Sequence, residues 1–74
     1  MRPDTTILLV EDDDAARDVL ATGLRARGWQ VRVAANGRNA LDMLDSADPD
    51  VVILDLGLPD LDGVEVCRHI RRLR

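Results

Sequence analysis

Two short apolar runs that lead into carboxylates constrain this chain more than any other feature. Residues 7–10 read Ile-Leu-Leu-Val and are followed by Glu11 and Asp12. Residues 51–54 read Val-Val-Ile-Leu and are followed by Asp55. Consecutive apolar residues are typical of strands that are covered on both faces, as in a parallel sheet with helices on each side. The rest of the chain must therefore supply those helices.

Helical periodicity and strand patterns alternate along the chain. We expect strands at residues 5–10, 29–35 and 50–55, and helices that end near Arg27, at Ala47 and near Leu73. Asp13 and Asp14 stand where the N-cap of the first helix is expected, and Gly28 is placed to end it. Asp48-Pro49 ends the second helix, which starts at Arg38. Alternating strands and helices with short loops predict an α/β fold with parallel strands and right-handed crossovers.

The apolar residues also predict which faces are buried. In the first helix the inward stripe is expected at Ala16, Val19, Leu20, Gly23 and Leu24, and in the second at Ala40, Leu41, Leu44 and Ala47. The second strand alternates, with Trp29, Val31 and Val33 inward, which favours an edge position.

Charge and composition exclude several classes of protein. The 74 residues carry 14 acidic and 10 basic side chains, for a net charge of −4, which argues against nucleic acid as a direct partner. No apolar run approaches the roughly 20 residues that span a bilayer, so no membrane partner is expected. The first residues lack the apolar core of a signal peptide, and we expect a cytoplasmic protein. The single Cys excludes a multi-Cys metal site.

The carboxylates behind the two apolar runs form the candidate site. In an open parallel sheet, ligands bind at the carboxyl ends of the strands, so Glu11, Asp12 and Asp55 converge if the two strands are neighbours. Like charges at short range resist ionisation, and a divalent cation such as Mg²⁺ or Mn²⁺ relieves the conflict. Acidic residues after a strand also serve as turn formers and helix caps, which explains Asp13 and Asp14 without any ligand.

These stretches resemble the receiver domain of two-component response regulators. The resemblance is carried by residues 7–13, Ile-Leu-Leu-Val-Glu-Asp-Asp, and residues 52–63, Val-Ile-Leu-Asp-Leu-Gly-Leu-Pro-Asp-Leu-Asp-Gly. It covers the whole chain and is most similar to receivers joined to winged-helix DNA-binding domains. It implies a flavodoxin-like, doubly wound parallel sheet, truncated to three strands in the order 2-1-3 and three helices.

The resemblance implies a role for each matching residue. Asp55 corresponds to the phosphoacceptor, which takes a phosphoryl group from a sensor histidine kinase. Asp12 corresponds to the direct ligand of Mg²⁺, Glu11 to its partner through water, and Gly57 to the residue whose backbone carbonyl completes the metal shell. Two further residues shape the loop into the third helix, Pro59 and Gly63. A chain with these roles is a phosphoacceptor signalling domain and not a conventional enzyme.

The chain also departs from the family. Residues 1–74 correspond to the N-terminal portion of a single receiver domain, whose strand order is 2-1-3-4-5 when complete. The Ser or Thr and the Lys that contact the phosphoryl group would lie in the remaining part, and this chain has no Lys at all. A natural fragment, an engineered one and an incomplete sequence all fit. The third strand then lies at an edge, where an apolar strand predicts self-association.

Two other functions compete with the phosphoacceptor. The first is a structural or interaction module that self-associates without phosphotransfer. The second is a haloacid-dehalogenase-like phosphatase, because residues 60–64 read Asp-Leu-Asp-Gly-Val. That motif requires a strand immediately before it, and Pro59 cannot continue a central strand.

Overall fold

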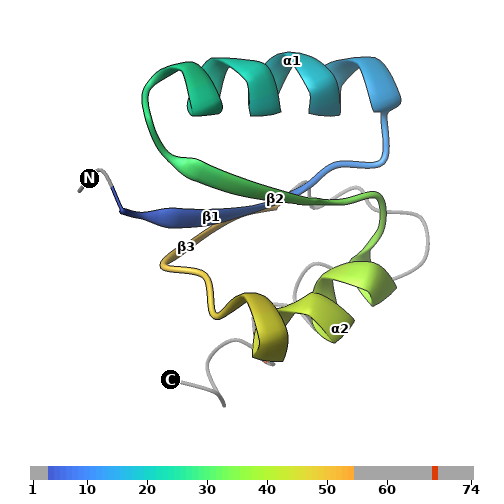
Figure 1. Ribbon diagram of the computed structural model, residues 1–74. Coiled ribbons are helices and arrows are strands. Elements are labelled where there is room, and N and C mark those ends of the chain that lie inside the picture. Colours follow the sequence, from blue (N-terminus) through green and yellow to red (C-terminus); the bar gives the residue numbers. More distant parts are fainter. Residues whose placement is uncertain (1–3, 55–67, 69–74) are drawn as a thin grey trace.

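The computed structural model describes residues 4–54 and residue 68. Its elements are, in chain order, β1 (Thr6–Val10), α1 (Asp14–Ala26), β2 (Gln30–Ala34), α2 (Gly37–Ala47) and β3 (Val51–Leu54) (Figure 1). They match the expected elements to within a residue or two at each end. The loop that Pro59 and Gly63 are expected to shape lies outside the described residues, as does the third helix, expected to end near Leu73, apart from residue 68. No helix of the described part is long and apolar enough to cross a membrane.

The three strands form a parallel sheet in the order β2-β1-β3. β1 pairs with β2 from Thr6↔Gln30 to Val10↔Ala34. It pairs with β3 from Ile7↔Val51 to Val10↔Leu54. The expected order 2-1-3 is therefore confirmed, and β1 is the central strand of the described sheet.

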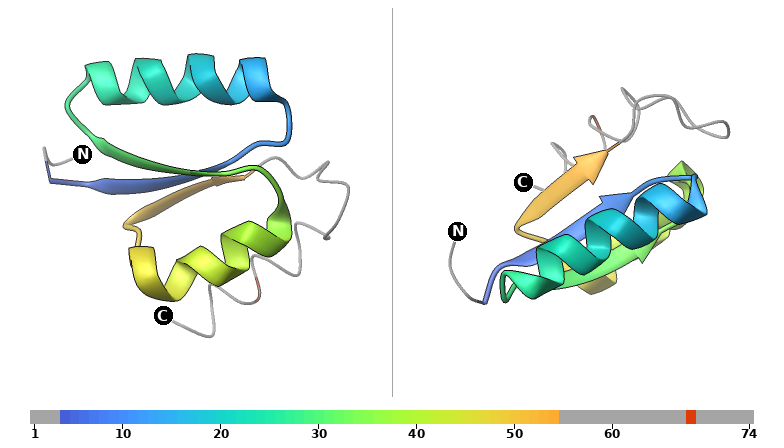
Figure 2. Two further views of the ribbon diagram at one scale, coloured as in Figure 1. Left: turned by 45° about the vertical axis from the view of Figure 1, so that its right-hand side comes forward. Right: turned by 90° about the horizontal axis from the view of Figure 1, so that it is seen from above.

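The helices cover opposite faces of the sheet, as Figure 2 shows from two sides. One core cluster lies under α2 and contains Leu8, Val10, Ala34, Ala40 and Leu44. The other lies under α1 and contains Ile7, Leu9, Ala21 and Val31. Every residue from Ile7 to Val10 is at most 1% exposed, because alternate side chains of β1 point into the two clusters. The consecutive apolar residues of β1 thus reflect a strand that is covered on both faces.

The predicted inward stripe of α1 is partly wrong. Val19 is 72% exposed and Leu20 is 44% exposed, whereas Ala21 is buried. Leu24 packs against the cluster under α1, as expected. The side chain of Arg17 is only 16% exposed. The face toward the sheet therefore follows residues 17, 21 and 24, and the helix is rotated relative to the stripe that the apolar residues predict.

The structure confirms the predicted edge position of the second strand, but its side chains do not alternate fully between buried and exposed. β2 lies at one end of the described sheet, and Val31 is buried with Trp29 packed against the same cluster. Val33 is 37% exposed although it lies on the same face of the strand as Val31. Ala34 is buried on the opposite face, under α2.

The predicted helix ends are confirmed. Asp13 is the N-cap of α1, and its side chain accepts a hydrogen bond from the backbone N–H of Ala16 at 2.8 Å. Gly28 follows α1 with φ of 93°, a left-handed conformation that glycine adopts without strain. Asp48 ends α2 in the same region, with φ of 42°. In α2 the predicted face is confirmed at Ala40 and Leu44, which are buried.

Candidate functional site

The carboxyl ends of β1 and β3 lie side by side. Val10 and Leu54 are partners in the register of these two strands, so Glu11 and Asp55 each follow a paired position. The backbone N–H of Glu11 donates to the carbonyl of Ala34 at 3.1 Å, which extends the pairing of β1 with β2 by one residue. Glu11 is therefore fixed to the sheet, and it is the first residue of the acidic loop, residues 11–13.

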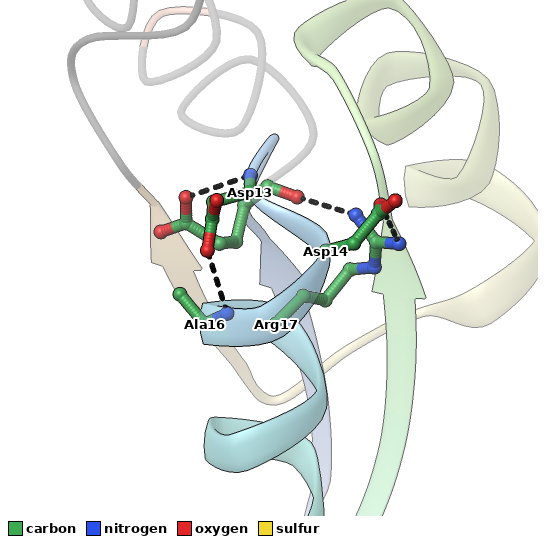
Figure 3. Close-up of polar contacts among 5 residues, drawn as sticks. Asp13, Asp14, Ala16 and Arg17 are labelled. Atoms are coloured by element: carbon green, nitrogen blue, oxygen red, sulfur yellow. Dashed lines mark hydrogen bonds and ion pairs between the residues drawn. The ribbon is translucent and has the colours of Figure 1, made fainter.

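The β1–α1 loop carries three acidic residues, Glu11, Asp12 and Asp13, and Figure 3 shows the polar contacts around Asp13. The half-buried Glu11 turns its carboxylate back on the loop, and its Oε1 accepts a hydrogen bond from the backbone N–H of Asp13 at 3.1 Å. Asp12 is exposed. Asp13 caps α1, which confirms the structural role expected for it. Glu11 and Asp12 are thus the two acidic side chains of the loop that do not cap the helix.

A half-buried arginine at the start of α1 bonds to this loop. Arg17 lies in the first turns of α1, and its Nη1 donates to the backbone carbonyl of Glu11 at 3.0 Å. Its Nη2 pairs with Oδ1 of Asp14 at 2.6 Å. Sequence reasoning missed Arg17 because it counted only apolar residues on the inner face of the helix. A signal was present, since Arg17 follows Asp14 at the i, i+3 spacing that brings side chains together on a helix.

The two described carboxylates of the candidate site, Glu11 and Asp12, are of a type that suits a hard divalent cation. Carboxylate oxygens are the ligands that Mg²⁺ prefers, usually one or two carboxylates with retained waters. Glu11 and Asp12 supply such oxygens at the strand end, and the bond to Asp13 engages one of the two oxygens of Glu11. The described residues contain no group of three side chains that could hold a metal ion. The predicted third carboxylate, Asp55, lies outside the described residues, as do Gly57, Pro59 and Gly63.

Comparisons of the chain with protein-family models and with known proteins agree on one family. Residues 7–74 match the response regulator receiver domain. The transcriptional regulatory protein AfsQ1 of Streptomyces coelicolor is 48% identical over 67 residues, which cover 90% of this chain and 30% of AfsQ1. The response regulator MprA of Mycolicibacterium vanbaalenii is 49% identical over 65 residues, which cover 88% of this chain and 28% of MprA. The chain thus spans less than a third of the length of these relatives.

Solved structures of the same fold agree. TrrA from Thermotoga maritima, a response regulator crystallised in complex with Mg²⁺-BeF, superposes with a TM-score of 0.87 at 36% identity, and covers 95% of this chain and 61% of that chain. The receiver domain of Ssk1 from Saccharomyces cerevisiae, in co-crystal with the histidine phosphotransfer protein Ypd1, gives a TM-score of 0.88 at 29% identity. That match covers 99% of this chain and 50% of that chain.

Proposed function

Because the chain belongs to the response regulator receiver domain family, we propose that it is the phosphoacceptor part of a two-component phosphorelay. Residues 1–74 form the N-terminal portion of one receiver domain. The phosphoryl donor is a sensor histidine kinase, and the acceptor is Asp55. The cytoplasm, which supplies the ATP that such a kinase consumes, is the proposed location.

The observation that carries this proposal is the pairing of Val10 with Leu54. The register brings together the carboxyl ends of two neighbouring parallel strands, where ligands of open α/β sheets bind, and Glu11 and Asp55 follow these ends directly in the sequence. Glu11 is in addition held to the sheet through the carbonyl of Ala34. A phosphoacceptor at residue 55 would therefore face a preformed acidic loop.

The proposed reaction is a nucleophilic displacement at phosphorus. A carboxylate oxygen of Asp55 forms the new O–P bond while the P–N bond of the phosphohistidine breaks. The electron pair of that bond returns to the imidazole nitrogen, which takes up a proton, and Asp55 becomes an acyl phosphate. The protein contributes mainly by positioning the acceptor and by balancing charge.

Asp12 would hold Mg²⁺ directly, Glu11 through water, and Asp55 and the carbonyl of Gly57 would complete the protein ligands. Mn²⁺ fits the same oxygen donors. When bound, the cation supplies neutralising charge for the phosphoryl oxygens. Pro59 and Gly63 are proposed to shape the loop that follows the acceptor.

The phosphoacceptor is tested with acetyl phosphate, a small phosphodonor. The chain is incubated with acetyl phosphate and Mg²⁺, and intact mass is followed for an added phosphoryl group that is labile to base. We expect Asp55→Asn to abolish labelling and Asp12→Asn to slow it. Asp42→Asn, on the exposed face of α2, is the matched control and should label like the unmodified chain. Labelling that survives Asp55→Asn would refute the assignment.

A second candidate function rests on the edge formed by β3. Among the described residues β3 pairs with β1 alone, and Ile53 is 38% exposed. An apolar edge strand without charge is a template for pairing with another chain. We propose that two copies associate through β3, which would be antiparallel at the junction because a two-fold axis reverses the strand direction.

Light scattering over a dilution series tests this association. Ile53→Lys should shift the chain toward the monomer, because it places a charge on an exposed edge position. Val52→Lys is less suitable, since Val52 packs against the core cluster under α2 and a lysine there would also destabilise the fold. A chain that is monomeric at high concentration without any substitution would contradict the proposal.

A further inference from the structure

We propose that Arg17 is a positioning residue that holds the β1–α1 loop in the conformation that binds the divalent cation. The inference rests on the proposed function, because it assigns Arg17 a role toward the Mg²⁺ ligands Glu11 and Asp12. Arg17 itself does not touch the ligand. It acts through the backbone of the residue from which the acidic loop departs.

The guanidinium group joins the start of the loop to the first residue of α1. Nη1 donates to the carbonyl of Glu11 at 3.0 Å, and Nη2 donates to Oδ1 of Asp14 at 2.6 Å (Figure 3). The two acceptors lie on either side of Asp12 and Asp13 in the sequence. A planar guanidinium presents its N–H groups in a fixed fork, so two bonds from one group fix the spacing of their acceptors.

Glu11 is held on both of its backbone polar groups. Its N–H donates to Ala34 of β2, and its carbonyl accepts from Arg17 of α1. The backbone of Glu11 is therefore bonded to the sheet through its N–H and to the helix through its carbonyl, which belongs to the peptide unit that leads into Asp12. Groups that orient metal ligands from outside the coordination shell commonly change metal affinity when they are removed.

The burial of Arg17 separates it from an ordinary surface arginine. Its side chain is 16% exposed, while that of Asp14 is 87% exposed. Arg17 lies on the face of α1 that meets the sheet, at the helical spacing of Ala21 and Leu24. A side chain held there loses little further freedom when it bonds to the loop.

Arg25 provides a matched control on the same helix. Its Nη2 donates to the backbone carbonyl of Val31 at 2.9 Å, which is also a part-buried bond over six residues. That bond joins the C-terminal end of α1 to β2, at the end of the sheet opposite the acidic loop. If both arginines only stabilise the fold, their replacements should affect Mg²⁺ binding equally.

The test compares Arg17→Lys and Arg17→Gln with Arg25→Lys and Arg25→Gln. Mg²⁺ is titrated while the amide NMR signals of residues 11–13 are followed, and circular dichroism confirms that each variant is folded. Lysine keeps the charge but not the fork, so it separates geometry from charge. We expect both Arg17 variants to raise the Kd for Mg²⁺ about tenfold and both Arg25 variants to leave it unchanged.

Hydrogen exchange of the Asp13 amide in metal-free protein gives a second readout. This N–H bonds to Glu11, and it should exchange faster in the Arg17 variants than in the Arg25 variants. Equal Kd values for the two pairs of variants would overturn the inference. If the unmodified chain binds no Mg²⁺, the proposed metal site fails, and unchanged exchange of Asp13 then overturns the positioning role as well.

Discussion

The two described helices are built alike but are held differently. Each begins with an Asx side chain that accepts a hydrogen bond from an N–H three residues on, Asp13 in α1 and Asn36 in α2, at 2.8 Å in both. Each is followed by a residue in the left-handed region, Gly28 after α1 and Asp48 after α2. Their apolar faces differ, because α2 buries Ala40 and Leu44 whereas α1 buries only Ala21.

The difference follows from the contacts that each helix makes with the sheet and with the loop before it. α2 covers one face of the sheet with Ala40 and Leu44, which are buried, and with Leu41 and Met43, which pack against the same cluster. α1 covers the other face but also carries Arg17, whose guanidinium takes a place on the inner face and bonds to the acidic loop. Part of the packing area of α1 is thus given to a polar contact, and Val19 and Leu20 are exposed. The helix next to the candidate site thus combines the apolar contacts of Ala21 and Leu24 with the polar bonds of Arg17.

The largest expected contrast is in the cores under the two helices. Leu44→Ala removes a side chain that is 5% exposed, and we expect a loss of about 3 kcal/mol in the free energy of unfolding. Leu20→Ala removes one that is 44% exposed, and we expect a loss below about 0.5 kcal/mol. Urea unfolding followed by Trp29 fluorescence measures both. Equal losses would show that the exposed face of α1 is covered in solution.

This contrast also marks how far the sequence predicted the fold. The cap at Asp13, the stop at Gly28 and the buried face of α2 were predicted, because each depends on local patterns. The strand order was predicted from the resemblance to receiver domains, and the structure confirms it. The rotation of α1 was not predicted. Hydrophobic periodicity places apolar residues on one side of a helix, but contacts with the sheet decide which part of that side is covered. Arg17 was overlooked because long charged side chains can bury their apolar stems while their heads find polar partners.

The candidate site was predicted only in part for a different reason. Runs of apolar residues located the ends of β1 and β3, and the parallel register confirms that these ends are neighbours. The pattern contains no information on how a loop folds back on itself, so the bond from Asp13 to Glu11 could not be foreseen. The roles of Asp55 and Gly57 stay predictions that rest on the family.

The helix ends give the next contrast. Gly28 has φ of 93°, and a Cβ built there meets nothing within 4 Å. Gly28→Ala should therefore cost only the backbone strain, about 1–2 kcal/mol. Asp48 already accepts φ of 42° after α2, so Asp48→Gly should change the free energy of unfolding by less than about 0.5 kcal/mol. Thermal unfolding measures both, and a tolerated Gly28→Ala would refute the claim that α1 needs glycine at its end.

The two N-caps should contribute similar amounts to the free energy of unfolding. Asp13→Ala and Asn36→Ala each remove the acceptor for one helix N–H, and each should cost about 1 kcal/mol. Asp13→Asn keeps an acceptor but removes the charge, so it should cost less than Asp13→Ala. Denaturant midpoints of the three variants test this order. If Asn36→Ala were neutral while Asp13→Ala was costly, the cap of α2 would be dispensable.

The smallest effect concerns the acidic residue that α1 has in its first turn and α2 lacks. Asp14→Asn leaves an oxygen near Arg17 but removes the negative charge. That charge interacts favourably with the positive end of the helix dipole and forms the ion pair with Arg17. We expect the free energy of unfolding to fall by only about 0.5 kcal/mol at low salt, because Asp14 is largely exposed and its ion pair is therefore weak.

Asn39→Asp introduces an acid in the first turn of α2 and should stabilise that helix by a similar amount, about 0.5 kcal/mol. Both changes should shrink as salt is raised to 1 M, where the Debye length falls to about 3 Å. A loss at Asp14 that persisted in 1 M salt would mean that its hydrogen bond to Arg17, and not its charge, holds the start of α1.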